Sequence, residues 1–509
     1  MRTANSVRNV KYAVLGQFFA IIINLIARIV FVKVLSAEYL GLSGLFSNIL
    51  TILCLSELGF GTAMSYQLYK PLADNDTEKV KSLLKLYKKI YIIIGIIILG
   101  LGCLCIPVYP YLINELPDIK NIDLIYILFV INTASSYFFA YKRILVTADQ
   151  KQYISTFYKY SFYFLLNILQ IIELLLFKNY ILFLCIQIII TLFENFFLSI
   201  KVNKIYPYLK EKNVKNVSDH DIKDMKFNVK AMFFHKFGGV VLNSTDNIII
   251  SKYLGLASVG IYSNYLLITN ALNSIVSQIF NSVVASIGNL DVTSGKNSMT
   301  KVFDKVFFLN FWIYCVCTIC LISLFNPFIN LWLGSEYTLP LFSVIVISIN
   351  FYIFGMRKTA MSFREATGNY YVDRISPIAE SILNICLSIF LVKYYGLAGV
   401  VLGTIISSLL TNFWCEPYVI CKKSLNKSIF EYLKVYIKYT LICIIIAFIT
   451  IFISNLIPSE NIVMFLVKAV VAFIIPNLFL LILFRKNKYF KFYVSLIASK
   501  ILKINRKGN

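Results

Sequence analysis

The stretch YAVLGQFFAIIINLIARIVFV, residues 12–32, is the first long apolar run of the chain and decides its fold class. A helix over this run rises about 31 Å, which matches the roughly 30 Å hydrocarbon core of a bilayer. No small-residue cleavage site follows the run. We therefore expect it to remain in the membrane as a span, and not to be removed as a signal peptide.

The composition extends this reading to the whole chain. Of 509 residues, 59% are hydrophobic and only 15% are charged, against about 45–50% and about 25% in soluble domains. The apolar residues would furnish on the order of 12 to 15 spans of about 20 residues. This excludes a soluble protein and leaves little chain for a catalytic domain. The net charge of +24 is typical of a membrane protein with basic cytoplasmic loops as well as of a nucleic-acid-binding protein.

Apolar runs separated by Lys, Asp, Asn, Pro and Gly predict fourteen transmembrane helices and an all-α integral membrane protein. The predicted spans are 10–32, 43–66, 89–113, 122–141, 156–177, 180–200, 231–252, 258–286, 306–330, 339–356, 376–394, 397–420, 436–456 and 462–484.

Basic residues alternate strongly between successive connections of these spans. One set of alternate connections, which includes both termini, holds 41 of the 49 Lys and Arg residues, whereas the other set holds six. Because basic residues concentrate on the cytoplasmic side, we expect both termini in the cytoplasm. This alternation argues against nucleic-acid binding. The amino-acid usage, rich in Lys, Ile and Asn, suggests an AT-rich bacterial genome.

A weak internal repeat suggests two halves of six helices in parallel orientation. KVLSAEYLGLSGLF at 33–46 is similar to KYLGLASVGIYSNY at 252–265, with Gly41 and Gly260 at the same offset of 219 residues as Leu35 and Leu254. Each copy follows the first helix of its half. The predicted organisation is a lobe over 1–200, a basic cytoplasmic linker over 201–230, a second lobe over 231–420, and helices 13 and 14 with a basic tail over 421–509.

Several charged residues lie inside predicted spans, where each costs roughly 2.5–3.5 kcal/mol on insertion scales. Arg28 either reaches the outer interface or serves a function, and Lys33 already marks the outer end of its span. Glu57 is either a structural ion-pair partner or a functional acid. In both cases we expect its side chain to face the interior of the helix bundle. The other acids inside spans are Glu173, Glu194, Asp246 and Glu380.

The seventh predicted span, HKFGGVVLNSTDNIIISKYLG from 235, is too polar to face lipid. His235 and Lys236 open it, and Asn243 and Asp246 lie near its middle. Such residues are tolerated where they line a watery cavity or a seam between helices, and we favour the cavity. His235 alone is a modest signal, because a lone histidine more often satisfies a hydrogen bond.

The segment RKTAMSFREATGNYYVDR, residues 357–374, follows the tenth predicted span on the cytoplasmic side. Arg357 and Arg364 lead a basic group that could receive an anion, since a guanidinium suits phosphate oxygens. The alternative is a set of topogenic charges against lipid headgroups.

The sequence offers no signal for an enzyme, a metal or a cofactor. The eleven cysteines lie mostly in apolar stretches without the spacing of a zinc site. No GxxxxGK[ST] run is present to bind ATP phosphates. Acids predicted outside the membrane are scattered over short connections.

Three stretches resemble polysaccharide flippases of the Wzx type, in the multidrug/oligosaccharidyl-lipid/polysaccharide (MOP) exporter superfamily. They are LGLSGLFSNILTILCLSELGFGTAMSYQLYKPLA at 40–73, HKFGGVVLNSTDNIIISKYLGLASVGIYSNY at 235–265, and FREATGNYYVDRISPIAESILNICLSI with GLAGVVLGTIIS at 363–407. The resemblance implies two six-helix lobes around a central cavity, plus two further helices. It also implies that an undecaprenyl-diphosphate-linked oligosaccharide crosses from the cytoplasmic to the outer leaflet.

The resemblance places the cationic cavity residues at Arg28 and Lys236 and the acid of the seventh helix at Asp246. Other flippases of the superfamily carry more arginines in the first two helices than this chain does. The substrate-binding set we predict is Arg28, His235, Lys236, Asn243, Arg357 and Arg364, with Glu57, Asp246 and Glu380 as ion-coupling or structural acids.

The functional hypothesis is a flippase that works by alternating access for surface polysaccharide synthesis, in contact with membrane lipids and with polysaccharide assembly proteins as further candidate partners. The membrane potential or an exchanged ion would supply the energy. The rival hypotheses are a multidrug or cation antiporter of the same superfamily, a membrane polymerase or glycosyltransferase, and a lipid II flippase.

Overall fold

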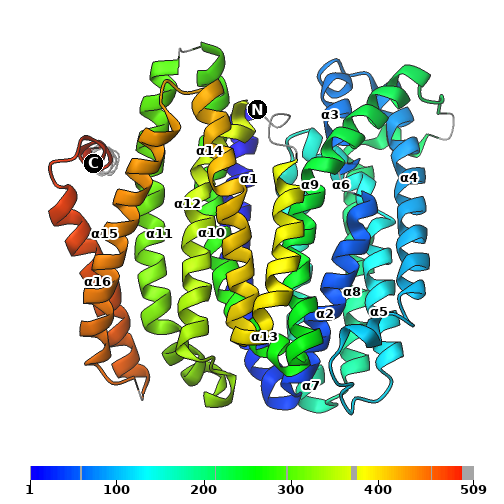
Figure 1. The fold of residues 1–509 in the computed structure, drawn as a ribbon. Helices are drawn as coiled ribbons and strands as arrows, with labels where there is room; N and C mark the ends of the chain where they lie inside the picture. Colours follow the sequence, from blue (N-terminus) through cyan, green and yellow to red (C-terminus); the bar gives the residue numbers. More distant parts are fainter. Residues whose placement is uncertain are drawn as a thin grey trace, which may run out of the picture. The chain divides into compact units, whose positions relative to one another are not determined.

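The computed structural model describes residues 2–57, 60–211, 214–293, 296–367, 375–459 and 461–495. All regular structure in these ranges is helical, which confirms the predicted all-α fold (Figure 1). The chain forms two compact units, Met1–Ser263 and Asn264–Asn509. The four-part division predicted from the sequence stays a prediction.

The first unit contains nine α-helices and the start of a tenth within its described residues. They are α1 (Arg2–Val34), α2 (Ala37–Leu53), α3 (Phe60–Ala73), α4 (Thr77–Leu104), α5 (Ile122–Tyr137), α6 (Ala140–Ala148), α7 (Gln152–Leu176), α8 (Tyr180–Ile205), α9 (Asp219–Leu254) and α10 (Leu256–Thr293). Short 3₁₀ turns are η1 (Cys54–Glu57), η2 (Tyr109–Leu112) and η3 (Pro207–Lys210).

The second unit continues from α10. Its remaining elements are α11 (Lys296–Leu333), η4 (Ser335–Tyr337), α12 (Leu341–Thr367), α13 (Ser376–Leu410), α14 (Asn412–Lys423), α15 (Ile429–Asn455) and α16 (Ile462–Phe484).

The predicted number of fourteen spans is not confirmed. Among the described residues, nine helices are long and apolar enough to cross a membrane, or ten if α5 and α6, bent by 42°, form one span. The predicted span 43–66 is divided, because α2 ends at Leu53 and α3 begins only at Phe60. These helices indicate a multi-pass membrane protein.

Side-chain caps and glycines fix several helix boundaries. The Asp76 carboxylate accepts the backbone N–H of Lys79 at the start of α4, and Ser428 and Glu431 form a reciprocal capping box at α15. Gly255 ends α9 with φ +82°, and Gly396 interrupts α13 with φ +55°. Positive φ is accessible to glycine without steric cost.

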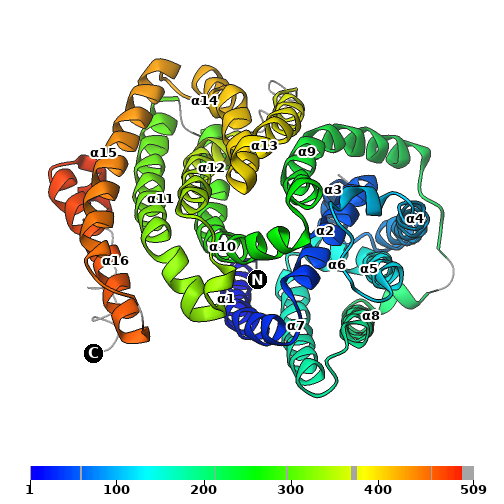
Figure 2. The same cartoon turned by 60° about the horizontal axis from the view of Figure 1, so that its bottom comes forward.

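In the first unit, α7 packs against α1 and α8, while α5 packs against α4 and α8 (Figure 2). Helix α2 packs against α9. In the second unit, α11 contacts α12, α15 and α16, and α12 also contacts α13 and α14. Each unit is therefore a bundle with its own buried interior.

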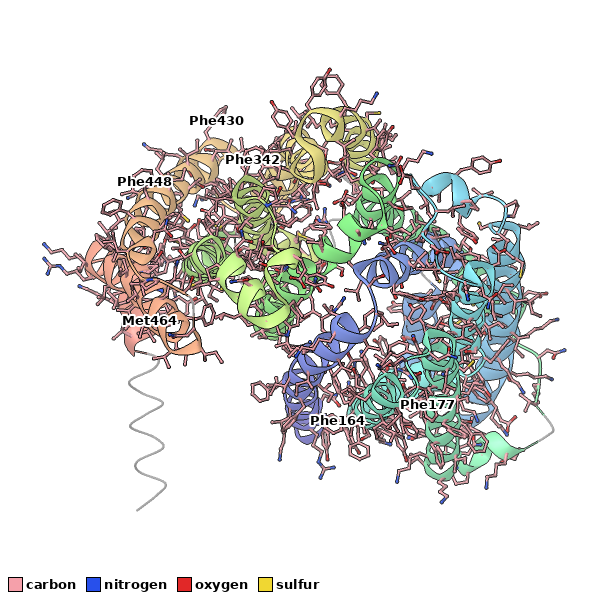
Figure 3. All side chains as sticks on the ribbon, turned by 90° about the horizontal axis from the view of Figure 1, so that it is seen from below. Phe164, Phe177, Phe342, Phe430, Phe448 and Met464 are labelled. Carbon is pink, nitrogen blue, oxygen red and sulfur yellow. The ribbon has the colours of Figure 1, made fainter. Side chains whose placement is uncertain are left out.

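Large apolar side chains cover the outside of both units, as expected for a chain that contacts lipid. Figure 3 labels six of them, Phe164, Phe177, Phe342, Phe430, Phe448 and Met464, all of which are exposed. Phe430 and Phe448 in α15 expose 79% and 78% of their surface. In water such exposure would be unfavourable, whereas a bilayer solvates it.

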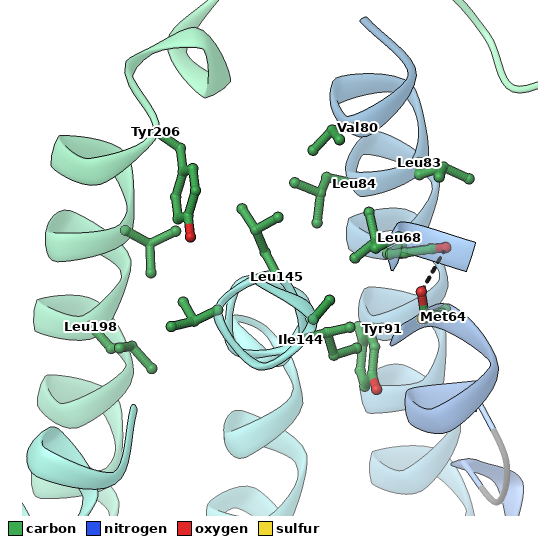
Figure 4. Close-up of a cluster of buried hydrophobic side chains, with 14 of the residues drawn as sticks. Met64, Leu68, Val80, Leu83, Leu84, Tyr91, Ile144, Leu145, Leu198 and Tyr206 are labelled. Atoms are coloured by element: carbon green, nitrogen blue, oxygen red, sulfur yellow. Dashed lines mark hydrogen bonds between the residues drawn. The ribbon is translucent and has the colours of Figure 1, made fainter. Parts of the chain in front are cut away.

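A hydrophobic cluster closes one end of the first unit, where α4 begins and α8 ends (Figure 4). Leu145 of α6 is fully buried among residues of both helices, including Leu84 and Leu198. The Tyr87 hydroxyl donates to the Met64 carbonyl at 3.2 Å. This packing joins α3, α4, α6 and α8 into a rigid end of the bundle.

Candidate functional site

A cavity of about 510 Å³ lies inside the first unit, bordered by α1, α2, α5, α7, α8 and the first turns of α10. Its volume falls within the range of pockets that bind small ligands. Polar side chains contribute to its wall from five of these six helices, namely Asn24, Arg28, Ser43, Ser47, Tyr163, Asn167, Gln170, Tyr180, Gln187 and Ser263.

The helical repeat explains why these polar residues meet. Asn24, Arg28 and Phe31 lie on one face of α1, since residues three, four and seven apart share a face. The same spacing places Asn167, Gln170 and Leu174 on one face of α7. A polar stripe on an otherwise apolar helix is thus directed to the interior and away from lipid.

Arg28 supplies the positive charge of this cavity. It is half-buried, and its Nη1 donates to Ser263 Oγ at 3.2 Å. In the described part of the chain, no salt bridge joins Arg28 to a carboxylate, and none of the lining residues is acidic. A guanidinium in such a setting favours an anion, because burial without a counter-charge is costly.

Neutral hydrogen-bonding groups surround the arginine. Asn167 donates to the Tyr163 carbonyl at 2.8 Å, and Gln170 donates to the Phe183 carbonyl at 3.3 Å. Ser43 and Tyr180 hydroxyls are 2.5 Å apart. The amides and hydroxyls are therefore held in place, and they add donors and acceptors of the kind that bind hydroxyl-rich ligands.

The cavity lies near the end of the unit where α1 ends and α8 begins. Arg28 is six residues before Val34, about 9 Å along the helix axis. The distribution of basic residues in the sequence predicts that this end faces outward.

The second unit holds a separate buried group of charges. Arg357 donates to Glu380 at 3.0 Å and to Glu416 at 3.1 and 3.2 Å, and Arg364 lies 3.4 Å from Glu416. All four residues are at most 4% exposed. The Asn412 amide also donates to Glu380. Two arginines and two glutamates balance in charge and connect α12, α13 and α14.

The structure thus brings together Arg357, Arg364 and Glu380 of the predicted residues, and it places Arg28 in a cavity of the first unit. Glu57, at the end of η1, accepts a hydrogen bond from the Tyr91 hydroxyl at 3.2 Å. Asp246 is half-buried on α9. The roles predicted for these residues stay predictions.

Three predicted residues, His235, Lys236 and Asn243, belong to α9, but their side chains lie outside the described residues. Two further acids noted in the sequence have identified partners. Glu194 pairs with Arg143 at 2.6 Å, and Glu173 accepts the backbone N–H of Asn179 at 2.9 Å.

Sequence reasoning missed the amides of the cavity and one acid of the buried network. Asn24, Asn167, Gln170 and Gln187 lie inside predicted spans, and their helical spacing was a usable signal. Glu416 lies near the end of a predicted span, beside a basic loop. An acid at that position gives no sign of burial, because it could reach water or a neighbouring lysine. Across the ranges that the structure covers, no group of three potential metal ligands occurs.

The model of a family described as polysaccharide biosynthesis protein matches residues 6–285. A search of curated protein sequences gives no match.

Solved structures of similar fold are transporters and flippases. The lipid II flippase MurJ in an inward closed conformation has a TM-score of 0.64 and 17% identity, over 93% of this chain and 99% of that one. An inward-facing multidrug resistance MATE transporter of the MOP superfamily has a TM-score of 0.63 and 14% identity, over 82% and 99%. The Vibrio cholerae MATE transporter VcmN in a bent form has a TM-score of 0.54 and 11% identity, over 83% and 97%. The family match confirms the predicted resemblance to polysaccharide-synthesis proteins, and the solved structures show that the fold is shared with a transporter of the MOP superfamily.

Proposed function

The chain belongs to the polysaccharide biosynthesis protein family, and from this membership we propose that it is a flippase for a lipid-diphosphate-linked oligosaccharide. The substrate would be an undecaprenyl-diphosphate-linked repeat unit that moves from the inner to the outer leaflet of a bacterial cytoplasmic membrane. Both termini would lie in the cytoplasm, and proteins of polysaccharide assembly would act on either side of the step.

The observation that carries this proposal is Arg28 in its amide-lined cavity. A diphosphate cannot cross hydrocarbon as a bare anion, and a guanidinium fork matches its oxygens. The neighbouring Asn167 and Gln170 offer hydrogen bonds to sugar hydroxyls. The lipid tail would remain in the bilayer while the headgroup passes by alternating access.

The composition of the cavity also favours this substrate over that of a cation antiporter. A cationic drug would be stabilised by carboxylates, whereas the described lining residues include an arginine and no acid. A membrane polymerase or glycosyltransferase remains the alternative from another class, and formation of glycosidic bonds by the purified protein would identify it.

The energy for export has two candidate sources. The membrane potential favours movement of an anion out of a negative interior by about 2.3 kcal/mol per charge per 100 mV. An exchanged ion would instead need an acid, for which Glu57, Asp246 and Glu380 are the candidates; of these, Glu380 forms an ion pair with Arg357.

The decisive experiment measures surface polysaccharide export in cells that depend on this chain. Arg28→Gln should lower export roughly 10- to 150-fold, the equivalent of one lost charge-assisted hydrogen bond. Arg28→Lys should retain part of it, since a point charge remains without the planar fork. Lys33→Gln, on the exposed last turn of the same helix, is the matched control. Wild-type export by the Arg28→Gln variant, at equal membrane abundance, would remove Arg28 from the site.

A further inference from the structure

A second cavity, of about 420 Å³, lies at the opposite end of the first unit. It is bordered by the start of α4, by α6, by the end of α8 and by η3. Tyr180 lines the first cavity and Asn203 lines this one, so the two lie roughly 35 Å apart along α8. The second cavity is therefore independent of the substrate site proposed above.

Lysines dominate the wall of this cavity. Five of its lining residues are lysines, Lys81, Lys85, Lys88, Lys142 and Lys210, whereas Glu211 is the single acid among the described lining residues. The five lysines come from two helices, α4 and α6, and from the 3₁₀ turn η3. The fold brings these lysines together from separate parts of the sequence, so they do not form a single basic run.

One of the five lysines is already neutralised. Lys81 is 4% exposed and forms ion pairs with Glu78 and Glu211. Glu211, the single acid among the described lining residues, is therefore paired with the buried Lys81. Four lysines remain.

The remaining lysines have neutral partners or none among the described atoms. Lys142 Nζ donates to Ser199 Oγ at 2.5 Å, and Lys85 Nζ donates to the Val214 carbonyl at 3.2 Å. No salt bridge in the described ranges joins Lys85, Lys88, Lys142 or Lys210 to a carboxylate. Like charges held around one hollow repel each other, so an anion in the hollow would stabilise the arrangement.

Hydrophobic packing supports the walls of this cavity. The cavity residues Leu84 and Leu209 belong to or pack against the hydrophobic cluster of Figure 4. Tyr141 lies beside Lys142, whose Nζ is 5.8 Å from the centre of the Tyr141 ring. Tyr141 and Asn203 add neutral polar groups to the cationic ones.

The position of the cavity indicates where its ligand comes from. The basic connections that surround it are the ones that the sequence assigns to the cytoplasmic side. Beyond Lys88, helix α4 exposes Ile93, Ile96 and Ile97 at 45%, 60% and 41%. An acyl chain can therefore run along α4 while a headgroup enters the cavity, as in basic pockets at the cytoplasmic ends of transmembrane helices.

We propose that this lysine cavity binds a phosphate group, supplied by the headgroup of an anionic phospholipid in the cytoplasmic leaflet. The same chemistry would accept a soluble phosphate, so the test must separate the two sources. The site is a lipid or anion site additional to the transport cavity.

The test compares the full chain in two kinds of nanodisc, one of phosphatidylcholine alone and one containing phosphatidylglycerol. Bound phosphatidylglycerol is counted by native mass spectrometry after release from the disc. In a parallel arm, inorganic phosphate is titrated into the phosphatidylcholine discs. The pocket variant is K88Q/K142Q/K210Q, and the control is K89Q/K201Q/K204Q, which removes three exposed lysines from α4 and α8 outside the cavity lining.

Each lysine near the membrane surface contributes about fivefold to anionic lipid binding, so the pocket variant should retain phosphatidylglycerol at least about tenfold less well. The control should stay within about twofold of wild type. Both variants should melt at the wild-type temperature in phosphatidylcholine discs, because Lys81 and its partners are untouched. Binding in the phosphate arm alone, lost in the pocket variant only, would support the site and assign it to a soluble anion. Absence of binding in both arms, or equal losses in pocket and control variants, would overturn the proposal.

Discussion

Gly41 and Gly260 make reciprocal backbone contacts across the α2–α10 interface. The Cα of Gly41 packs against the carbonyl of Leu256, and the Cα of Gly260 packs against the carbonyl of Ala37. Ala37 and Leu256 are separated by the same 219 residues as the two glycines. The contact therefore has an approximate twofold relationship, of the kind expected if the two stretches descend from one repeated unit.

The glycine pair gives a sharp stability prediction. A Cβ at either position would meet a backbone carbonyl that cannot rotate away, so Gly41→Ala and Gly260→Ala should each destabilise the fold by about 1–3 kcal/mol. Gly100→Ala is the control, because a Cβ there meets nothing within 4 Å and alanine is the better helix former. Thermal unfolding in detergent should show lower midpoints for the first two variants and an unchanged or higher midpoint for the third.

The buried network of the second unit predicts a larger effect. Glu416→Gln removes a buried carboxylate that contacts both Arg357 and Arg364, and breaking such buried pairs costs about 3–5 kcal/mol. Glu336→Gln, at an exposed position of the same unit, should have no measurable effect. Unfolding midpoints in matched detergent provide the comparison. Equal stability of the two variants would mean that the network contributes nothing to the fold.

The interruption of α13 predicts a position where only glycine fits. Gly396 has φ +55° and ψ −134°, although a Cβ there would meet no atom within 4 Å. The cost of Gly396→Ala is thus conformational and not steric, about 1–3 kcal/mol. Asparagine should not rescue the position, because ψ lies outside the left-handed helical region that asparagine tolerates. A midpoint for Gly396→Ala equal to that of wild type would contradict this assignment.

The sequence predicted the helical class, and it singled out Arg28 as a charge inside a span, for one physical reason. A charge or an unpaired backbone group in hydrocarbon is so costly that spans must be apolar helices. Both an apolar run and a charged residue inside such a run can therefore be read directly from the sequence. The same rule does not reveal which residues meet. The pairing of Arg357 with Glu416 depends on how α12 and α14 pack.

The broken span at residues 43–66 shows a second limit of sequence reasoning. Mean hydropathy over this stretch is high enough for one helix, but η1 interrupts it after Leu53. Glu57 lies in that break and bonds to Tyr91. Local interruptions of this kind depend on tertiary partners, which an apolar-run criterion does not include.

The amides of the cavity around Arg28 give a prediction that separates sugar recognition from anion recognition under the proposed function. Asn167→Leu and Gln170→Leu preserve side-chain size and remove hydrogen-bonding groups from a wall of the cavity. Each should slow transport of a lipid diphosphate that bears an oligosaccharide by about 2- to 12-fold, the range for one neutral hydrogen bond. Transport of the same lipid diphosphate without sugars should change little, because Arg28 is intact. The measurement is leaflet exchange in proteoliposomes, with Gln152→Leu on the exposed first turn of α7 as the control. An equal loss for both substrates would show that these amides support the cavity without contacting the sugars.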